Sequence, residues 1–80
     1  MSLGQAAVYR IVVQGALAEE FADRLGGLRL QVDPGAHGGT ATTLTGRLRD
    51  QSQLLGVLNG LYEMHLPILS IELIELLEVE

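Results

Sequence analysis

The 80-residue sequence contains no cysteine, no lysine and no tryptophan. Without cysteine, the chain can form neither a disulfide framework nor a thiolate metal site. Its cationic side chains are five arginines, set against ten acidic residues, and the formal charge is −5. Binding to nucleic acid or to an anionic membrane surface depends on clustered lysine and arginine. We therefore expect neither a nucleic-acid partner nor a membrane partner.

Long hydrophobic runs are also missing. No segment approaches the roughly 18 consecutive apolar residues of a membrane-spanning helix, and the first residues lack the basic and apolar regions of a signal peptide. We expect a soluble, cytoplasmic protein. We further expect residues 1–7 to be a disordered or vector-derived tail, residues 8–76 a single domain, and residues 77–80 an acidic C-terminal end.

The sequence is rich in apolar residues instead. Hydrophobic residues make up 48% of the chain, and 16 residues are leucine. A domain of this size buries only about 60% of the surface that its unfolded chain exposes, and here apolar packing alone must hold the core. Pairing with a second copy buries further apolar surface. We therefore expect a homo-oligomer, most simply a dimer.

Hydrophobic periodicity and turn residues divide the chain into six elements and one long loop. In the first part of the chain we expect a strand over 8–15, an amphipathic helix over 17–25 stopped by Gly26-Gly27, and a strand over 28–32. A loop over 33–39 and a strand over 40–48 are expected next. The last two elements are a helix from the N-cap Asp50 to about Met64 and a strand over 68–76. The glutamates at positions 72, 75 and 78 would also suit a helix, but Pro67 and the β-branched Ile68 favour a strand.

The order strand, helix, strand, strand, helix, strand predicts an α+β fold. Two split crossover units of this kind give the ferredoxin-like βαββαβ arrangement, a four-stranded antiparallel sheet with both helices on one face.

Several stretches resemble a family of small stand-alone bacterial proteins. The shared features are a threonine-rich strand that ends in Thr-Gly, an Asp-Gln helix start, a leucine-rich helix, and a last strand opened by Leu-Pro. They occupy Gly39–Gly46, Asp50-Gln51, Leu54, Gly56, Leu58 and Leu66–Ile71, and Gly15 and Gly26–Leu28 also fit. The resemblance covers roughly residues 9–74. It implies a ferredoxin-like fold and no assigned activity. Leu55 and Arg47 stand where the family often has His and Pro.

A weaker similarity links residues 50–58 to the ligand-side helix of ACT domains, which are amino-acid-binding regulatory modules of similar topology. The turn after the first strand, Gln14-Gly15-Ala16-Leu17, lacks the Asp and Pro that ACT domains place there. The similarity therefore concerns the fold, and a shared fold does not imply a shared function.

Side chains for catalysis are scarce. The serines are Ser2, Ser52 and Ser70, and none stands in a nucleophile elbow or next to a histidine that could activate it. The two histidines, His37 and His65, fit a solvated loop and a helix end better than a metal site. We expect no enzymatic activity and no catalytic, cofactor or metal site.

Two surfaces are candidates for binding. Strand alternation places one set of residues on the sheet face opposite the helices: Arg10, Val12, Arg29, Gln31, Thr43, Thr45 and Arg47. This face is either a solvated polar surface, a homodimer interface, or a site for a small anion among the guanidinium groups. The second surface is a stripe of small residues on the second helix, Ser52, Gly56 and Gly60, which either the first helix or a partner chain can approach closely.

Two hypotheses for the function follow. The first is a small non-enzymatic binding or interaction protein that self-associates and serves a partner protein. The alternative is an ACT-like regulatory module that binds an amino acid or a small anion at a dimer interface.

Overall fold

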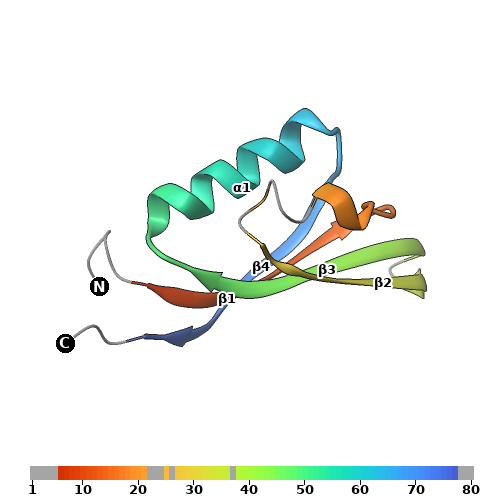
Figure 1. The fold of residues 1–80 in the computed structure, drawn as a ribbon. Helices are drawn as coiled ribbons and strands as arrows, with labels where there is room; N and C mark the ends of the chain where they lie inside the picture. The colour runs from red at the N-terminus through yellow and green to blue at the C-terminus, as the bar shows by residue number, and fades with distance from the viewer. Residues whose placement is uncertain (1–5, 22–24, 26, 37, 78–80) are drawn as a thin grey trace.

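The computed structural model describes residues 6–21, 25, 27–36 and 38–77. The elements follow in the order β1 (Ala7–Gln14), the 3-10 helix η1 (Glu19–Phe21), β2 (Arg29–Ala36), β3 (Gly39–Leu48), α1 (Gln51–Glu63) and β4 (Ile68–Leu76). The four strands form one antiparallel sheet in the order β2-β3-β1-β4. Figure 1 shows α1 lying across one face of this sheet. The fold is therefore a small α+β fold whose strand order is broadly that of the ferredoxin-like arrangement, with one helix in the described residues instead of the expected two.

One face of the sheet forms the core with α1. Along β1, buried residues alternate with residues that face the other side, as expected for a strand with one covered face. The core consists of Ala7, Tyr9, Ile11, Val13, Leu17, Leu25, Leu28, Leu44, Leu48, Val57 and Leu61. The other face, which we call the open face, is covered by no element in the described part of the chain (Figure 1).

The helix α1 begins as the sequence predicts. The Asp50 side chain caps it by accepting a hydrogen bond from the Gln53 amide at 2.8 Å. The Gln53 Oε1 atom accepts a hydrogen bond from the amide of Arg49, also at 2.8 Å. In the usual capping box this side chain bonds the amide of the N-cap residue, which here is Asp50, so the contact lies one residue earlier. At the other end, His65 adopts a positive φ of 60° and Pro67 follows before β4.

The prediction of a first helix over 17–25 is wrong for the described residues, which hold the short η1 there and one α-helix, α1. Residues 22–24 and the expected cap residue Gly26 lie outside the described residues. A nine-residue helix is marginal without tertiary support. Leu17 and Leu25 are nevertheless buried, so the segment delivers its apolar side chains to the core.

The loop expected over 33–39 is also wrong, because β2 continues to Ala36 and β3 starts at Gly39. The register shifts between Pro34 and Ala36, and Gly35 has a φ of 87°. A bulge of this kind keeps a strand going past a residue that does not pair. Proline is tolerated because β2 is an edge strand, where a missing N–H need not break a ladder. His37 lies outside the described residues.

The ends of the domain are close to the expected ones. β1 begins at Ala7, and Ala6 is buried, one to two residues inside the predicted tail. β4 spans Ile68–Leu76, which confirms the prediction of a strand over 68–76. The Leu77 amide donates to the Ala6 carbonyl at 2.9 Å and extends the pairing beyond the strand. Residues 1–5 of the tail and 78–80 of the acidic end lie outside the described residues.

Candidate interaction surfaces

The edge strand β4 is exposed along its whole length. Six of its nine residues are large and apolar, with exposed fractions between 38% and 46%: Ile68, Leu69, Ile71, Leu73, Ile74 and Leu76. None of them belongs to the core or to the partly buried residues packed against it. Within the described residues, β4 is therefore held by its backbone ladder to β1, and its apolar side chains are only partly buried.

Four of these apolar residues point to the same side of the sheet as α1. Directly paired residues of an antiparallel ladder share a face. The register pairs Ile68 with Val13, Ile71 with Ile11, Leu73 with Tyr9, and Leu76 with Ala7, all core residues of β1. The other two, Leu69 and Ile74, lie at the two register shifts of β4. The helix face of β4 is thus apolar but not covered by α1.

One flank of α1 carries exposed apolar side chains too. An ideal Cβ on Gly60 would lie 2.8 Å from Leu25 Cδ2, so the flank with Gly60 faces the segment that leads into β2. Tyr62 follows two residues later, about 200° around the helix, and Leu55 lies on the same side one heptad earlier. These two side chains are 78% and 59% exposed. By this helical geometry they lie on the flank opposite Gly60, and β4 is the edge strand opposite β2 in the sheet.

We call this surface the β4–α1 strip and define it as Leu55, Tyr62, Ile68, Ile71, Leu73 and Leu76. The opposite edge strand, β2, is different in character. It carries Arg29, Asp33 and Pro34, which are features that prevent pairing with another strand. β4 lacks proline, but it carries two charged residues, Glu72 and Glu75, and two register shifts. The two edges of the sheet therefore differ in the proline of β2 and in the exposed apolar side chains of β4.

The open face carries the residues that the sequence analysis placed there. The register aligns them in three rows across the strands: Arg29, Thr45, Arg10 and Glu72; Gln31, Thr43, Val12 and Ser70; Arg47, Val8 and Glu75. In two of these rows the positive end lies on β2 or β3 and the negative end lies on β4. The open face is therefore polarised across the sheet.

Most of these charges have no partner in the described part of the chain. Arg10 Nη1 and Glu72 Oε1 form an ion pair at 3.2 Å, with both side chains about half exposed. Arg29, Arg47 and Glu75 make no ion pair with any other described residue. Beside Arg29 lies a shallow depression of about 470 Å³, lined by Gly27, Arg29, Gln31, Thr45 and Gly46.

The three small residues of the stripe on α1 have different surroundings within the chain. Gly60 packs against Leu25, which is a contact within the chain. Gly56 has nothing within 4 Å of its ideal Cβ, and Ser52 is exposed. The close approach that glycine permits is thus used at Gly60, by the segment where the first helix was expected.

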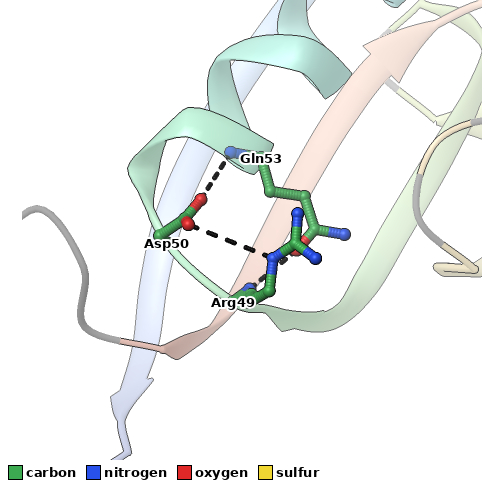
Figure 2. A network of polar contacts seen from close by, with 3 residues as sticks. All are labelled: Arg49, Asp50 and Gln53. Atoms are coloured by element: carbon green, nitrogen blue, oxygen red, sulfur yellow. Dashed lines mark hydrogen bonds and ion pairs between the residues drawn. The ribbon is translucent and has the colours of Figure 1, made fainter.

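The N-terminus of α1 is occupied by the protein's own carboxylate. Figure 2 shows the Asp50 side chain against the first turn, with Arg49 Nε 4.0 Å from its Oδ2 atom. This carboxylate already satisfies the amide of Gln53 that an external anion would bind. We therefore assign no anion site to the helix N-terminus.

Other kinds of site are not apparent in the described residues. They contain no group of three or more His, Asp or Glu side chains that could hold a metal ion. No helix among them is long and apolar enough to cross a membrane. A second depression, of about 400 Å³, is apolar and lined by Ala16, Leu17, Ala18, Phe21, Met64 and Leu66.

The residues of the open face were predicted from the sequence, whereas the β4–α1 strip was not. The signal was present, because residues 68–76 are apolar at positions of both parities instead of alternating strictly. A strand of this composition is typical of burial on both faces. Here it lies at an edge, and that placement depends on the strand order and on how far α1 reaches across the sheet.

Comparison with known proteins gives one match. No curated protein and no solved structure matches the chain. A family model described as "Domain of unknown function (DUF8691)" matches residues 8–72, which is most of the chain and nearly the range of the resemblance noted from the sequence. The chain therefore belongs to this family of domains of unknown function, DUF8691.

Proposed function

We propose that the protein is a small non-enzymatic interaction module that works as a homodimer joined along β4. The observation that carries this proposal is the nine-residue edge strand with six exposed, large apolar side chains. An exposed edge of this kind is a template for pairing with another strand. A contiguous exposed apolar surface in a small protein marks an interaction site.

A second copy of the chain suits this edge. A two-fold axis perpendicular to the sheet sets two β4 strands side by side in antiparallel pairing, so that one interface satisfies both edges. The four strands of each copy then form one continuous sheet with both α1 helices on the same face. The strips of the two copies become neighbours and shield each other from water.

The spacing of such a dimer leaves room for the strip side chains. The two β1 strands would be separated by three strand spacings, which is about 14 Å. Helices in direct contact lie about 8–10 Å apart. Because α1 contacts β3 and packs on core residues of β1 and β3, the two helices would lie at least as far apart as the two β1 strands and leave a gap floored by β4. Leu55 and Tyr62, which border this gap from each helix, would fill it.

The size of the domain supports the same proposal. A chain of 80 residues without disulfides buries a limited core, and small domains commonly gain stability by oligomerising. Because the apolar residues of β4 lie outside the core and stay 38–46% exposed, they gain further burial only when something covers them. A second copy supplies that cover without requiring any other component.

The test is the molar mass in solution, measured by sedimentation at about 0.5 M salt, where contacts between exposed charges are screened. The expected mass is twice the 8.6 kDa of the chain. The double variant Ile71→Thr/Leu73→Thr keeps residues that favour strands but weakens the strip. Taking about 1 kcal/mol for each half-exposed side chain buried, four lost contacts in the dimer raise its dissociation constant by at least about a hundredfold.

Val32→Thr is the matched control. Val32 lies on the other edge strand, its register partner Thr42 is buried on the helix side, and its exposed fraction of 43% is close to the 45% of Ile71. This variant is expected to leave the dimer intact. A wild-type protein that stays at 8.6 kDa at high micromolar concentration, or equal weakening by both variants, would contradict the proposal. If the protein stays monomeric alone and associates only with a different protein, the strip is the binding surface for that partner instead.

A further inference from the structure

We propose that the open face packs against the open face of another copy, with a two-fold axis parallel to the strands. This inference goes beyond the dimer along β4, because it concerns a different surface and rests on charge instead of apolar exposure. It assigns a role to Arg29 and Arg47, whose guanidinium groups have no ion-pair partner among the described residues.

The arrangement of charges on the face supports this axis. In the row of Arg29, Thr45, Arg10 and Glu72, the arginines lie on β2 and β1 and the glutamate lies on β4. In the row of Arg47, Val8 and Glu75, the arginine lies on β3 and the glutamate again on β4. A two-fold axis along the strands keeps each row in place and reverses it. Arg29 then faces Glu72 of the second copy, and Arg47 lies near its Glu75.

The same charges cannot satisfy each other within one chain. Arg47 and Glu75 both pair with Val8 from opposite sides, so their strands are about 10 Å apart. Glu72 is already bound by Arg10 and retains room to accept a second guanidinium, since a carboxylate has two acceptor oxygens. A reversed copy supplies the missing partners from about 10 Å away, the usual spacing of packed sheets.

One end of the three rows permits close packing of the sheets. The row there consists of Gln31, Thr43, Val12 and Ser70, which are uncharged and mostly small. Two such rows can approach without burying a charge, and their hydroxyl and amide groups can form hydrogen bonds across the interface. The two charged rows lie toward the other end, where water still reaches the outer row and its desolvation cost stays low.

Charge reversal tests this inference, in the Ile71→Thr/Leu73→Thr background that disables the β4 edge. At low salt, about 0.02 M, this protein is expected to sediment as a dimer, and at about 1 M salt as a monomer, because the Debye length falls to about 3 Å. Adding either Arg47→Glu or Glu75→Arg creates two repulsive contacts per dimer. Each variant is expected to raise the low-salt dissociation constant about tenfold or more.

The decisive experiment measures the low-salt dissociation constant of an equimolar mixture of the two variants. In a mixed pair, the reversed charge at position 47 meets the reversed charge at position 75, and the other contact is native. The mixture is therefore expected to recover the dissociation constant of the parent background. Asp33→Arg is the control, since Asp33 lies four residues from Arg29 on β2, about 13 Å along the strand, and it is expected to change the constant less than threefold.

A background protein that stays monomeric at low salt overturns the inference. So does a mixture that fails to recover association, or an Asp33→Arg variant that abolishes it, which would indicate an axis across the strands. The two proposals fail separately. A wild-type protein that is monomeric at high salt but shows charge-reversal rescue at low salt would contradict the β4 dimer and support the pairing of open faces.

Discussion

At the scale of single residues, Thr42 does most to hold the chain that follows β1. Its side chain is completely buried, and its Oγ1 atom accepts a hydrogen bond from the Leu17 amide at 3.1 Å. The same hydroxyl donates to the Gly15 carbonyl at 2.7 Å. Gly15 has a φ of 103°, which directs the chain out of β1 at this point. One threonine on β3 thus fixes the segment where a helix was expected.

The first prediction follows from this pair of hydrogen bonds. Thr42→Val keeps the shape of the side chain but leaves a buried amide and a carbonyl without their partner, so it should lower the free energy of unfolding by about 1–3 kcal/mol. Thr42→Ser keeps the hydroxyl and should cost less. Urea denaturation of the three proteins at one concentration measures the difference. A valine variant as stable as the wild type would contradict this role for Thr42.

At the scale of elements, the sequence allows prediction wherever a local signal determines the structure. β1, β3 and α1 follow from the alternation of Tyr9, Ile11 and Val13 and from the cap at Asp50, because these signals depend on the segment alone. The strand over 68–76 was predictable from Pro67 and the β-branched Ile68, which favour a strand over a helix there. The open face was predictable as well, since parity along a strand decides which residues share a face.

The elements that differ depend on tertiary context. Residues 17–25 have helical spacing, but η1 and the Thr42 contacts take that place in the described residues. Residues 33–36 look like a turn, but pairing with β3 extends β2 through them. The β4–α1 strip was missed because its exposure results from both the edge position of β4 and the lateral position of α1. Neither is encoded in the local pattern of residues 68–76.

The second prediction separates the two glycines of α1. Gly56→Ala places a methyl group in open space and should stabilise the helix by about 0.5–1 kcal/mol, since alanine is the better helix former. Gly60→Ala gains the same propensity, but its methyl group would lie 2.8 Å from Leu25 Cδ2. The displacement of Leu25 should offset most or all of that gain. Denaturation curves of both variants check this, and equal stabilisation would contradict the packing role of Gly60.

At the scale of the whole molecule, the fold is a thin slab of 41 × 20 × 17 Å. One helix covers one face of a four-stranded sheet (Figure 1). A two-layer slab of this kind has one core, one open face and two sheet edges. β2 protects one edge with proline, whereas β4 presents apolar side chains. The molecule is therefore asymmetric in a way that favours association along β4.

Association along β4 links folding to concentration. If a second copy covers the strip, the dimer is stabilised by mass action, and its melting temperature rises with protein concentration. The double variant Ile71→Thr/Leu73→Thr should lose this concentration dependence, whereas Val32→Thr should keep it. The dependence on concentration reports association itself, so it separates loss of the dimer from a general loss of stability.

The most direct test of pairing along β4 is hydrogen exchange at its backbone amides, resolved by NMR as a function of protein concentration. In a single copy, β1 pairs with one side of β4, so the amides between Ile68 and Leu76 that point away from β1 face solvent. We predict that these outward amides become protected as concentration rises, while those of β2 at the opposite edge do not. Outward amides of β4 that exchange freely at every concentration would contradict the dimer proposed here.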